Sequence, residues 1–418
     1  MKQRTLALLL AGAMALSLLS AGAMAAEESA QEAGEDSGLP VEEYIPDPVG
    51  SISFANLNHR MHESNLQILA IQESIDMLEE LDYDGMKEDL RLTLYQLAQA
   101  KWMMAQLGQT GTLAFEQMDQ AYSAVREQFD AIKDGDTQSD NADTVRQLKN
   151  VQNQIVMAGE TTYIALAAME IQESALDRQL AALDRQLTEL ELRYELGQIS
   201  SLTLQQAQAG RAALSSGLST LRMNLEAYKG QLELLLGADI TGGISLGALP
   251  RVTQEELDGM DLERDLEAAK ANSWSLYEAA ETMKDAKRAY TDQGGDDDYD
   301  YKTKHDVMSY MQARHNWYAA KYTYDNTVQN FELGLRSLYL KVRDYKQILD
   351  AANTTLAVER ENYAAAQLKQ SQGTLSLNGL LEAEDKLNEA REKVLSAEND
   401  LFSSYSTYRW AVDHGILN

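Results

Sequence analysis

The chain has 418 residues, no cysteine, four prolines and a formal net charge of −30 at pH 7. Without cysteine it has no disulfide framework, and the negative charge argues against nucleic acid or an anionic membrane surface as a partner. Three of the prolines lie between residues 40 and 48, and alanine, leucine, glutamine and glutamate are abundant. The composition therefore predicts an almost entirely helical fold from residue 51 onward.

Residues 1–25 have the pattern of a secretory signal peptide. Lys2 and Arg4 precede an apolar run over residues 6–19, and Ala23-Met24-Ala25 forms a small-x-small cleavage signal. No later stretch reaches the roughly 20 apolar residues that a membrane-spanning helix needs. Residues 26–50 are acidic and proline-containing, which predicts a flexible linker. We therefore expect an exported protein with no helical anchor after cleavage.

Residues 51–240 predict a first helical unit that ends in a long hairpin. Leucines and tyrosines step by four and three residues along two segments, as in a coiled-coil seam: Leu176, Leu180, Leu183, Leu187, Leu190 and Tyr194, then Leu214, Leu218, Leu221, Leu225, Tyr228, Leu232 and Leu235. Between them, "YELGQISSLTLQQAQ" at 194–208 offers Gly197 to end one helix and Ser200 or Ser201 to cap the next. We interpret it as a tight turn between antiparallel helices; one kinked helix is the alternative.

Residues 241–258 are rich in glycine, contain Pro250 and predict a linker. Residues 259–418 then repeat the first unit, with "LKQSQGTLSLNGLLEAE" at 368–384 matching the first turn at a constant offset of 176. The openings of the two units also match. Aligning Leu66 with Leu276 gives an offset of 210, which places about 34 extra residues inside the first unit.

The order of signal peptide, acidic linker and two such hairpin units resembles the TolC-like outer-membrane efflux proteins, over about residues 51–418. The resemblance implies a homotrimer whose twelve long helices form a hollow α-helical tube with an outer-membrane β-barrel at one end, which places the protein in the outer membrane and periplasm of the cell envelope. It further implies that the two turns dock on the periplasmic adaptor of a tripartite efflux or type I secretion system, which an inner-membrane transporter drives. Transferred by position, the docking residues are Gly197, Ile199, Ser200, Leu204, Gly373, Leu375, Ser376 and Leu380.

The sequence departs from this family where relatives insert two membrane-barrel strands per unit. The candidate insertion points, residues 107–115 and 291–303, are too short for two strands of about 9 to 11 residues each. The extra residues of the first unit instead have a helical pattern. We therefore expect an all-α fold of duplicated long helical hairpins without the β-barrel strands. The alternative to a passive export duct is a non-transporting coiled-coil scaffold of the cell envelope.

No pattern in the sequence predicts an enzyme, a cofactor or a metal centre. His59 and His62 lie three residues apart with no third ligand in sight, so an ordinary polar helix face explains them better. The acidic run at 296–300 has Val307 where a calcium loop would need its glutamate. Tyr310, Trp317 and Tyr324 recur every seven residues, which predicts packing between helices more strongly than a ligand platform.

Overall fold

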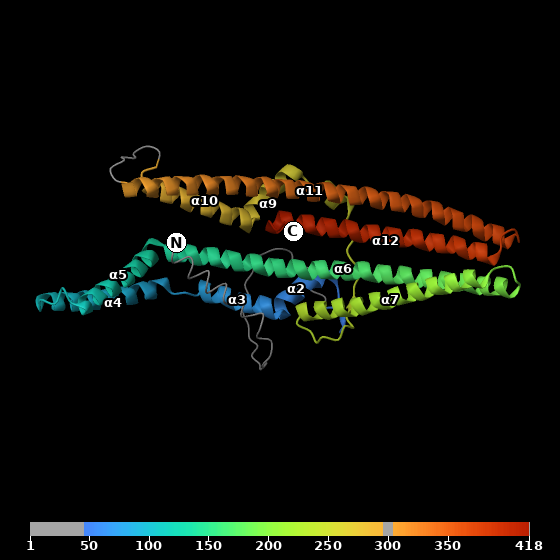
Figure 1. Ribbon diagram of the computed structural model, residues 1–418, viewed down its shortest axis with the longest axis horizontal. Helices are drawn as coiled ribbons and strands as arrows, with labels where there is room; N and C mark the ends of the chain where they lie inside the picture. The colour runs from blue at the N-terminus through green and yellow to red at the C-terminus, as the bar shows by residue number, and fades with distance from the viewer. Residues whose placement is uncertain (1–45, 296–303, 418) are drawn as a thin grey trace.

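The computed structural model describes residues 46–295 and 304–417 (Figure 1). The predicted signal peptide, most of the acidic linker and the acidic run at 296–300 lie outside these residues. The described part of the chain is helical apart from two short strands. Two-residue β1 (Ser51–Ile52) and β2 (Ser245–Leu246) pair in parallel, with Ser51 opposite Ser245. The predicted all-α fold class is confirmed.

Among the described residues, the first half contains six helices, and the second half follows after β2 with five. In chain order the first six are α2 (Phe54–Ser64), α3 (Leu66–Glu79), α4 (Tyr83–Gln106), α5 (Leu113–Asp134), α6 (Asp136–Glu195) and α7 (Ser201–Leu235). The next five are α8 (Gln254–Asp258), α9 (Leu262–Asn272), α10 (Trp274–Asp292), α11 (Lys304–Ser371) and α12 (Leu377–His414).

Four long helices form an elongated layer in the order α7, α6, α12, α11 (Figure 1). α6 packs on both α7 and α12, and α11 packs on α12, so α7 and α11 occupy the two edges. α6 has 60 residues and α11 has 68, which correspond to about 90 and 100 Å.

The predicted leucine seam is the contact between α6 and α7. Leu187, Leu218, Leu225 and Leu232 are buried along it, while Tyr194 and Tyr228 remain exposed. α6 ends at Glu195 and α7 begins at Ser201. The segment between them is a turn of an antiparallel hairpin, so the alternative of one kinked helix is wrong.

Each half opens with two helices separated by a break, and the breaks have the same geometry. Asn65 separates α2 from α3 with φ −73° and ψ 115°, and Ser273 separates α9 from α10 with φ −74° and ψ 118°. The offset between the openings is therefore 208 rather than 210. Leu66 is 77% exposed whereas Leu276 is buried; the true counterpart of Leu276 is buried Ile68, so the predicted alignment was two residues out.

The extra residues of the first half form a helical hairpin, α4–α5, as the sequence pattern predicted. Asp82 caps α4 by accepting from the amide of Gly85, and Thr112 caps α5 by accepting from that of Phe115. Gly135, with φ 88°, ends α5 and leads directly into α6. Of the described helices, none has an apolar stretch long enough to cross a membrane.

The aromatic heptad of α11 packs against α10, as predicted. Tyr310 is buried, and the ring of Trp317 stacks on Tyr290 at a centroid distance of 5.1 Å. Tyr290 also contacts Tyr310 at 5.5 Å. These rings hold the two helices together near the end of α10 and the start of α11.

Candidate functional site

The two hairpin turns lie at the same end of the molecule (Figure 1). They join α6 to α7 and α11 to α12, and together with the first helical turns of α7 and α12 they carry all eight residues that the sequence singles out for partner docking. α6 and α12 lie side by side up to this end. Arg185 pairs with Asp385 at 2.5 Å, and the amide of Asn378 donates to Glu189 at 3.3 Å. The structure therefore brings the two predicted sets of residues together.

The first turn closes α6 through a left-handed glycine. Gly197 has φ 70°, and the amide of Gln198 reaches back to the carbonyl of Arg193 at 2.8 Å. This bond satisfies a carbonyl that the helix end would otherwise leave free. Ser200 then caps α7, because its hydroxyl accepts from the amide of Thr203 at 3.2 Å. The chain reverses with its backbone groups paired.

The second turn repeats this geometry atom for atom at the offset of 176. Gly373 has φ 74°, and the amide of Thr374 bonds to the carbonyl of Lys369 at 2.9 Å. Ser376 caps α12 by accepting from the amide of Gly379 at 3.1 Å. Glycine and serine at these positions thus have a local structural role, which is to end one helix and start the next.

The eight predicted residues differ in what they present to solvent. Gly197, Ser200, Gly373 and Ser376 are exposed, whereas Ile199, Leu204, Leu375 and Leu380 are half-buried. The more exposed apolar groups are ones that the sequence pattern did not single out. Leu196 is 64% exposed, Leu202 62% and Leu377 61%. The sequence feature that marks these leucines is their position outside the four-and-three spacing of the seam, next to a helix break.

Each turn lies within a long stretch of chain without acidic side chains. Residues 196–225 and 362–381 contain neither aspartate nor glutamate. The arginines of α7 pair with acids of α6: Arg211 bonds to Asp184 at 2.5 Å, and Arg222 bonds to Glu173 at 2.7 Å. The hydrogen bond from Arg211 lowers the pKa of the Asp184 carboxyl. The turns therefore expose leucines, glycines and uncharged polar groups, and the nearest carboxylate is that of Glu195, just before Leu196.

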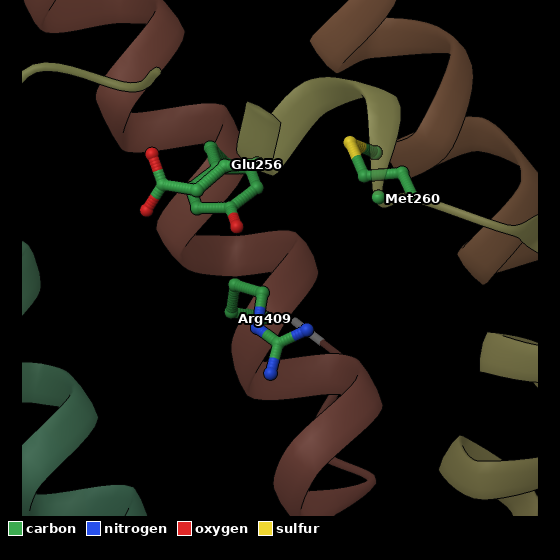
Figure 2. A pocket seen from close by; sticks show the side chains of 5 residues that line it. Glu256, Met260 and Arg409 are labelled. Atoms are coloured by element: carbon green, nitrogen blue, oxygen red, sulfur yellow. The ribbon is translucent and has the colours of Figure 1, made fainter. Parts of the chain in front are cut away.

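A surface hollow of about 540 Å³ lies between α8 and α12 (Figure 2). Glu256 and Arg409 line it, with Gly259, Met260 and Tyr405. Both charged groups already have partners: the Glu256 carboxylate accepts from the amide and hydroxyl of Thr253, and Arg409 pairs with Asp413 at 2.7 Å. The hollow therefore offers no unpaired charge to a ligand.

The histidine pair near the start of the chain lies on α2. His59 contacts Glu63 at 3.2 Å, and burial together with the nearby His59 lowers the pKa of His62. Within residues 46–295 and 304–417, no three histidine, aspartate or glutamate side chains are grouped as metal ligands.

Comparison with known proteins identifies the fold. No family model matches the sequence, and no curated protein does either. Among solved structures, the Campylobacter jejuni CmeC outer membrane channel matches with a TM-score of 0.51 and 12% identity, covering 94% of this chain and 95% of that one. The chain has a TolC-like fold.

Two further structures support the TolC-like fold over nearly its whole length. CusC, studied for folding and transmembrane channel formation, gives a TM-score of 0.51 at 12% identity, with 90% of this chain and 98% of that chain covered. The outer-membrane channel OprN gives 0.51 at 14% identity, with 87% and 90% covered. The resemblance drawn from the repeated turns is thereby confirmed for the fold, and residues 46–295 and 304–417 place both turns at one end of it.

Proposed function

We propose that the protein is the duct component of a tripartite efflux or type I secretion system in the cell envelope. It acts as a homotrimer that encloses a passive passage, catalyses no reaction and relies on an inner-membrane transporter for energy. The TolC-like fold and its similarity to outer-membrane channels support this role. One observation on the chain itself carries it further: the four-helix layer is open at both edges.

The α11 edge has an exposed apolar stripe with nothing packed on it among the described residues. Its members are Met308, Tyr322, Leu333, Leu340, Ile348 and Val358, between 45% and 76% exposed. Their spacings of 14, 11, 7, 8 and 10 residues keep all six within about 80° of the helix surface at 100° per residue, so they share one face. A stripe this long along a soluble helix indicates a surface that another helix covers.

The opposite edge, α7, also exposes apolar side chains. Leu202, Met223 and Leu234 are each at least 60% exposed, and their spacings of 21 and 11 residues again place them on one face. Two different edges on one protomer suit a heterologous contact, in which α11 of one copy packs on α7 of the next. Such a contact closes into a ring, and three copies give a tube of twelve long helices.

The two turns of each protomer would form one rim of this tube and dock on the periplasmic adaptor. Their exposed leucines suit an apolar contact, and the absence of acids over residues 196–225 and 362–381 avoids burying carboxylates there. We assign adaptor docking to the turn residues Gly197, Ile199, Ser200, Leu204, Gly373, Leu375, Ser376 and Leu380, with Leu196, Leu202 and Leu377 beside them.

Cysteine crosslinking tests the tube directly, because the natural chain has no cysteine. Met223 lies 26 residues after Gly197, and Ile348 lies 25 residues before Gly373, so they are at the same depth from the turns on opposite edges. In the double variant Met223→Cys, Ile348→Cys, a short bismaleimide should join neighbouring copies. We expect a ladder on a denaturing gel that ends at the trimer.

The matched control is Met223→Cys, Met308→Cys. Met308 belongs to the same α11 stripe but lies 40 residues further from the turn than Ile348, a shift of about 60 Å. This pair should not crosslink. A ladder that ends at the dimer, equal crosslinking of both pairs, or a monomeric mass by light scattering would overturn the tube and favour the non-transporting scaffold.

A further inference from the structure

The α4–α5 hairpin forms the end of the molecule opposite the turns (Figure 1). Its two helices pack on each other, α5 packs on α6, and the hydroxyl of Tyr83 at the start of α4 accepts from the amide of Asn141 on α6 at 2.8 Å. No residue of α4 is fully buried, and on α5 only Ile132, beside α6, is buried. The hairpin is therefore an arm whose far part contacts nothing else in the described chain.

α4 is apolar on two faces. Leu90, Leu94, Leu97 and Met104 are half-buried on the face toward α5. The other face carries Leu92, Tyr95, Trp102, Met103 and Leu107, each between 52% and 68% exposed. At 100° per residue these five span about 140° of the helix surface. A helix of a soluble hairpin needs only the first face, so the second one indicates a further contact.

The charge of this arm is unlike that of the chain as a whole. Residues 90–115 contain no aspartate or glutamate, although 66 acids in 418 residues would place about four in a stretch of that length. The two charged residues are Arg91 and Lys101. Lys101 pairs with Asp119 on α5 and lies over the ring of Tyr122 at 4.7 Å. The outer part of α4 and the apex thus have no carboxylate that contact with an apolar phase would have to desolvate, while the nearest ones, Glu116 and Asp119, lie on α5.

The exposed apolar surface continues onto the apex of the arm. Leu107 and Leu113 flank the turn between α4 and α5 and are 68% and 70% exposed. A neighbouring copy packed edge to edge covers the sides of a hairpin and leaves its apex free. Tryptophan and tyrosine beside exposed leucines, without acids, are typical of helices that lie in the boundary region of a lipid layer.

We propose that the outer end of the α4–α5 hairpin binds a neutral lipid surface. Trp102, Met103, Leu107 and Leu113 enter the headgroup region, and Tyr95 lies at its edge. The contact is peripheral and depends on the apolar side chains rather than on attraction of charges, since the whole chain is strongly acidic. It requires neither the trimer nor the adaptor, so it can fail or hold independently of the proposed duct.

Vesicle flotation tests this contact with the full mature chain. Vesicles of phosphatidylcholine and phosphatidylethanolamine should carry the protein upward in a density gradient. The double variant Trp102→Ser, Leu107→Ser removes two large exposed side chains and should lower the partition coefficient at least tenfold. The matched control, Leu196→Ser, Leu377→Ser, alters two equally exposed leucines at the opposite end and should float like the unchanged protein.

Fluorescence quenching locates the contact. Brominated phosphatidylcholine should quench part of the tryptophan emission, and the conservative variant Trp102→Phe should float normally but lose that quenching. Circular dichroism shows that each variant remains folded. Absence of flotation, or equal flotation of the two serine variants, would overturn the proposal. So would a Trp102→Ser, Leu107→Ser variant that loses self-association in buffer, because a second copy would then be the occupant.

Discussion

The side-chain amide of Asn65 donates to the carbonyl oxygen of Leu235 at 2.7 Å, across 170 positions of the chain. The second half contains the same tie, because Asn272 donates to the carbonyl of Val412 at 3.1 Å. The last helical turn of α7 is therefore held to the break between α2 and α3, and the last helical turn of α12 is held to the break between α9 and α10. The glycine that ends the returning helix, Gly237 or Gly415, lies against the same break.

The two glycines at these fastenings should tolerate no side chain. Gly237 has φ 62°, and a Cβ there would lie 2.1 Å from the carbonyl oxygen of Ser64. Gly415 has φ 64°, and a Cβ would lie 2.3 Å from the Cα of Ser273. We expect Gly237→Ala and Gly415→Ala each to lower the free energy of unfolding by about 3 kcal/mol or more. Urea denaturation measures the loss.

The turn glycines provide the control for this prediction. Gly197 and Gly373 have similar φ values of 70° and 74°, but a Cβ at either would meet nothing within 4 Å. Gly197→Ala and Gly373→Ala should therefore cost only about 1 kcal/mol, the cost of the left-handed backbone. Equal losses in the two pairs of variants would show that the close approach is unimportant.

Asn65 has two tasks that substitution can separate. Its side-chain oxygen accepts from the amides of Gln67 and Ile68 and so caps α3, while its nitrogen reaches Leu235. Asn65→Ala should lose both and cost about 2 kcal/mol. Asn65→Ser should keep the cap, as Ser273 does at the corresponding break, and cost about half as much. A serine variant as unstable as the alanine variant would contradict this division.

Glu233 should make folding sensitive to acid. Its buried carboxylate accepts from the amides of Thr241, Gly242, Gly243 and Ile244. Burial alone would raise its pKa, but these hydrogen bonds, led by that of Gly242, hold it below the usual value of 4.5. The stabilisation is therefore present above about pH 4.5 and is lost as the pH falls through the lower folded value.

The variant Glu233→Gln tests this dependence. It should lower the free energy of unfolding by about 1–3 kcal/mol at pH 7, because neutral amide oxygen is a weaker acceptor for several backbone amides. The difference from the unchanged protein should shrink below pH 4.5, as measured by urea denaturation at several pH values. A difference that stays constant down to pH 3 would contradict the assignment.

Tyr163 should hold the two short strands in place as a hydrogen-bond donor. Its buried hydroxyl lies 3.1 Å from the carbonyl oxygen of Ile52 and 2.8 Å from that of Gly247. Burial raises its pKa to about 12, so its contribution is complete below pH 10 and declines as the pH rises toward 12. Tyr163→Phe should cost about 1–2 kcal/mol at pH 7. Denaturation at pH 7 measures that cost, and an unchanged midpoint would exclude the role.

The long hairpins and their turns were predictable because local rules determine them. A left-handed glycine after the last leucine of the seam and a serine cap three residues later are sufficient to define each turn, and both halves obey them. The helical nature of residues 83–106 and 113–134 was predictable for the same reason, since each segment follows a capping residue, Asp82 or Thr112.

The opening breaks were less predictable because different residues make the same backbone shape. Asn65 and Ser273 share neither side chain nor flanking sequence, so matching leucines led to an alignment two residues out. The exposed leucines beside the turns were also missed. Exposure depends on which faces of a helix neighbouring helices cover, and periodicity along one helix does not contain that information.

The hydrogen bonds to Leu235 and Val412 hold each long hairpin at a point far from its turn, so a small rotation about that point moves the turn a long way. α7 extends 35 residues from Leu235 to Ser201, a length of about 50 Å. A rotation of α7 by about 5° about its hydrogen bond to Asn65 displaces the turn by about 4–5 Å, more than the length of a hydrogen bond. The distance between a protomer's two turns thus depends on angles set at Asn65 and Asn272, far from the turns, as well as on the α6–α12 contacts beside them.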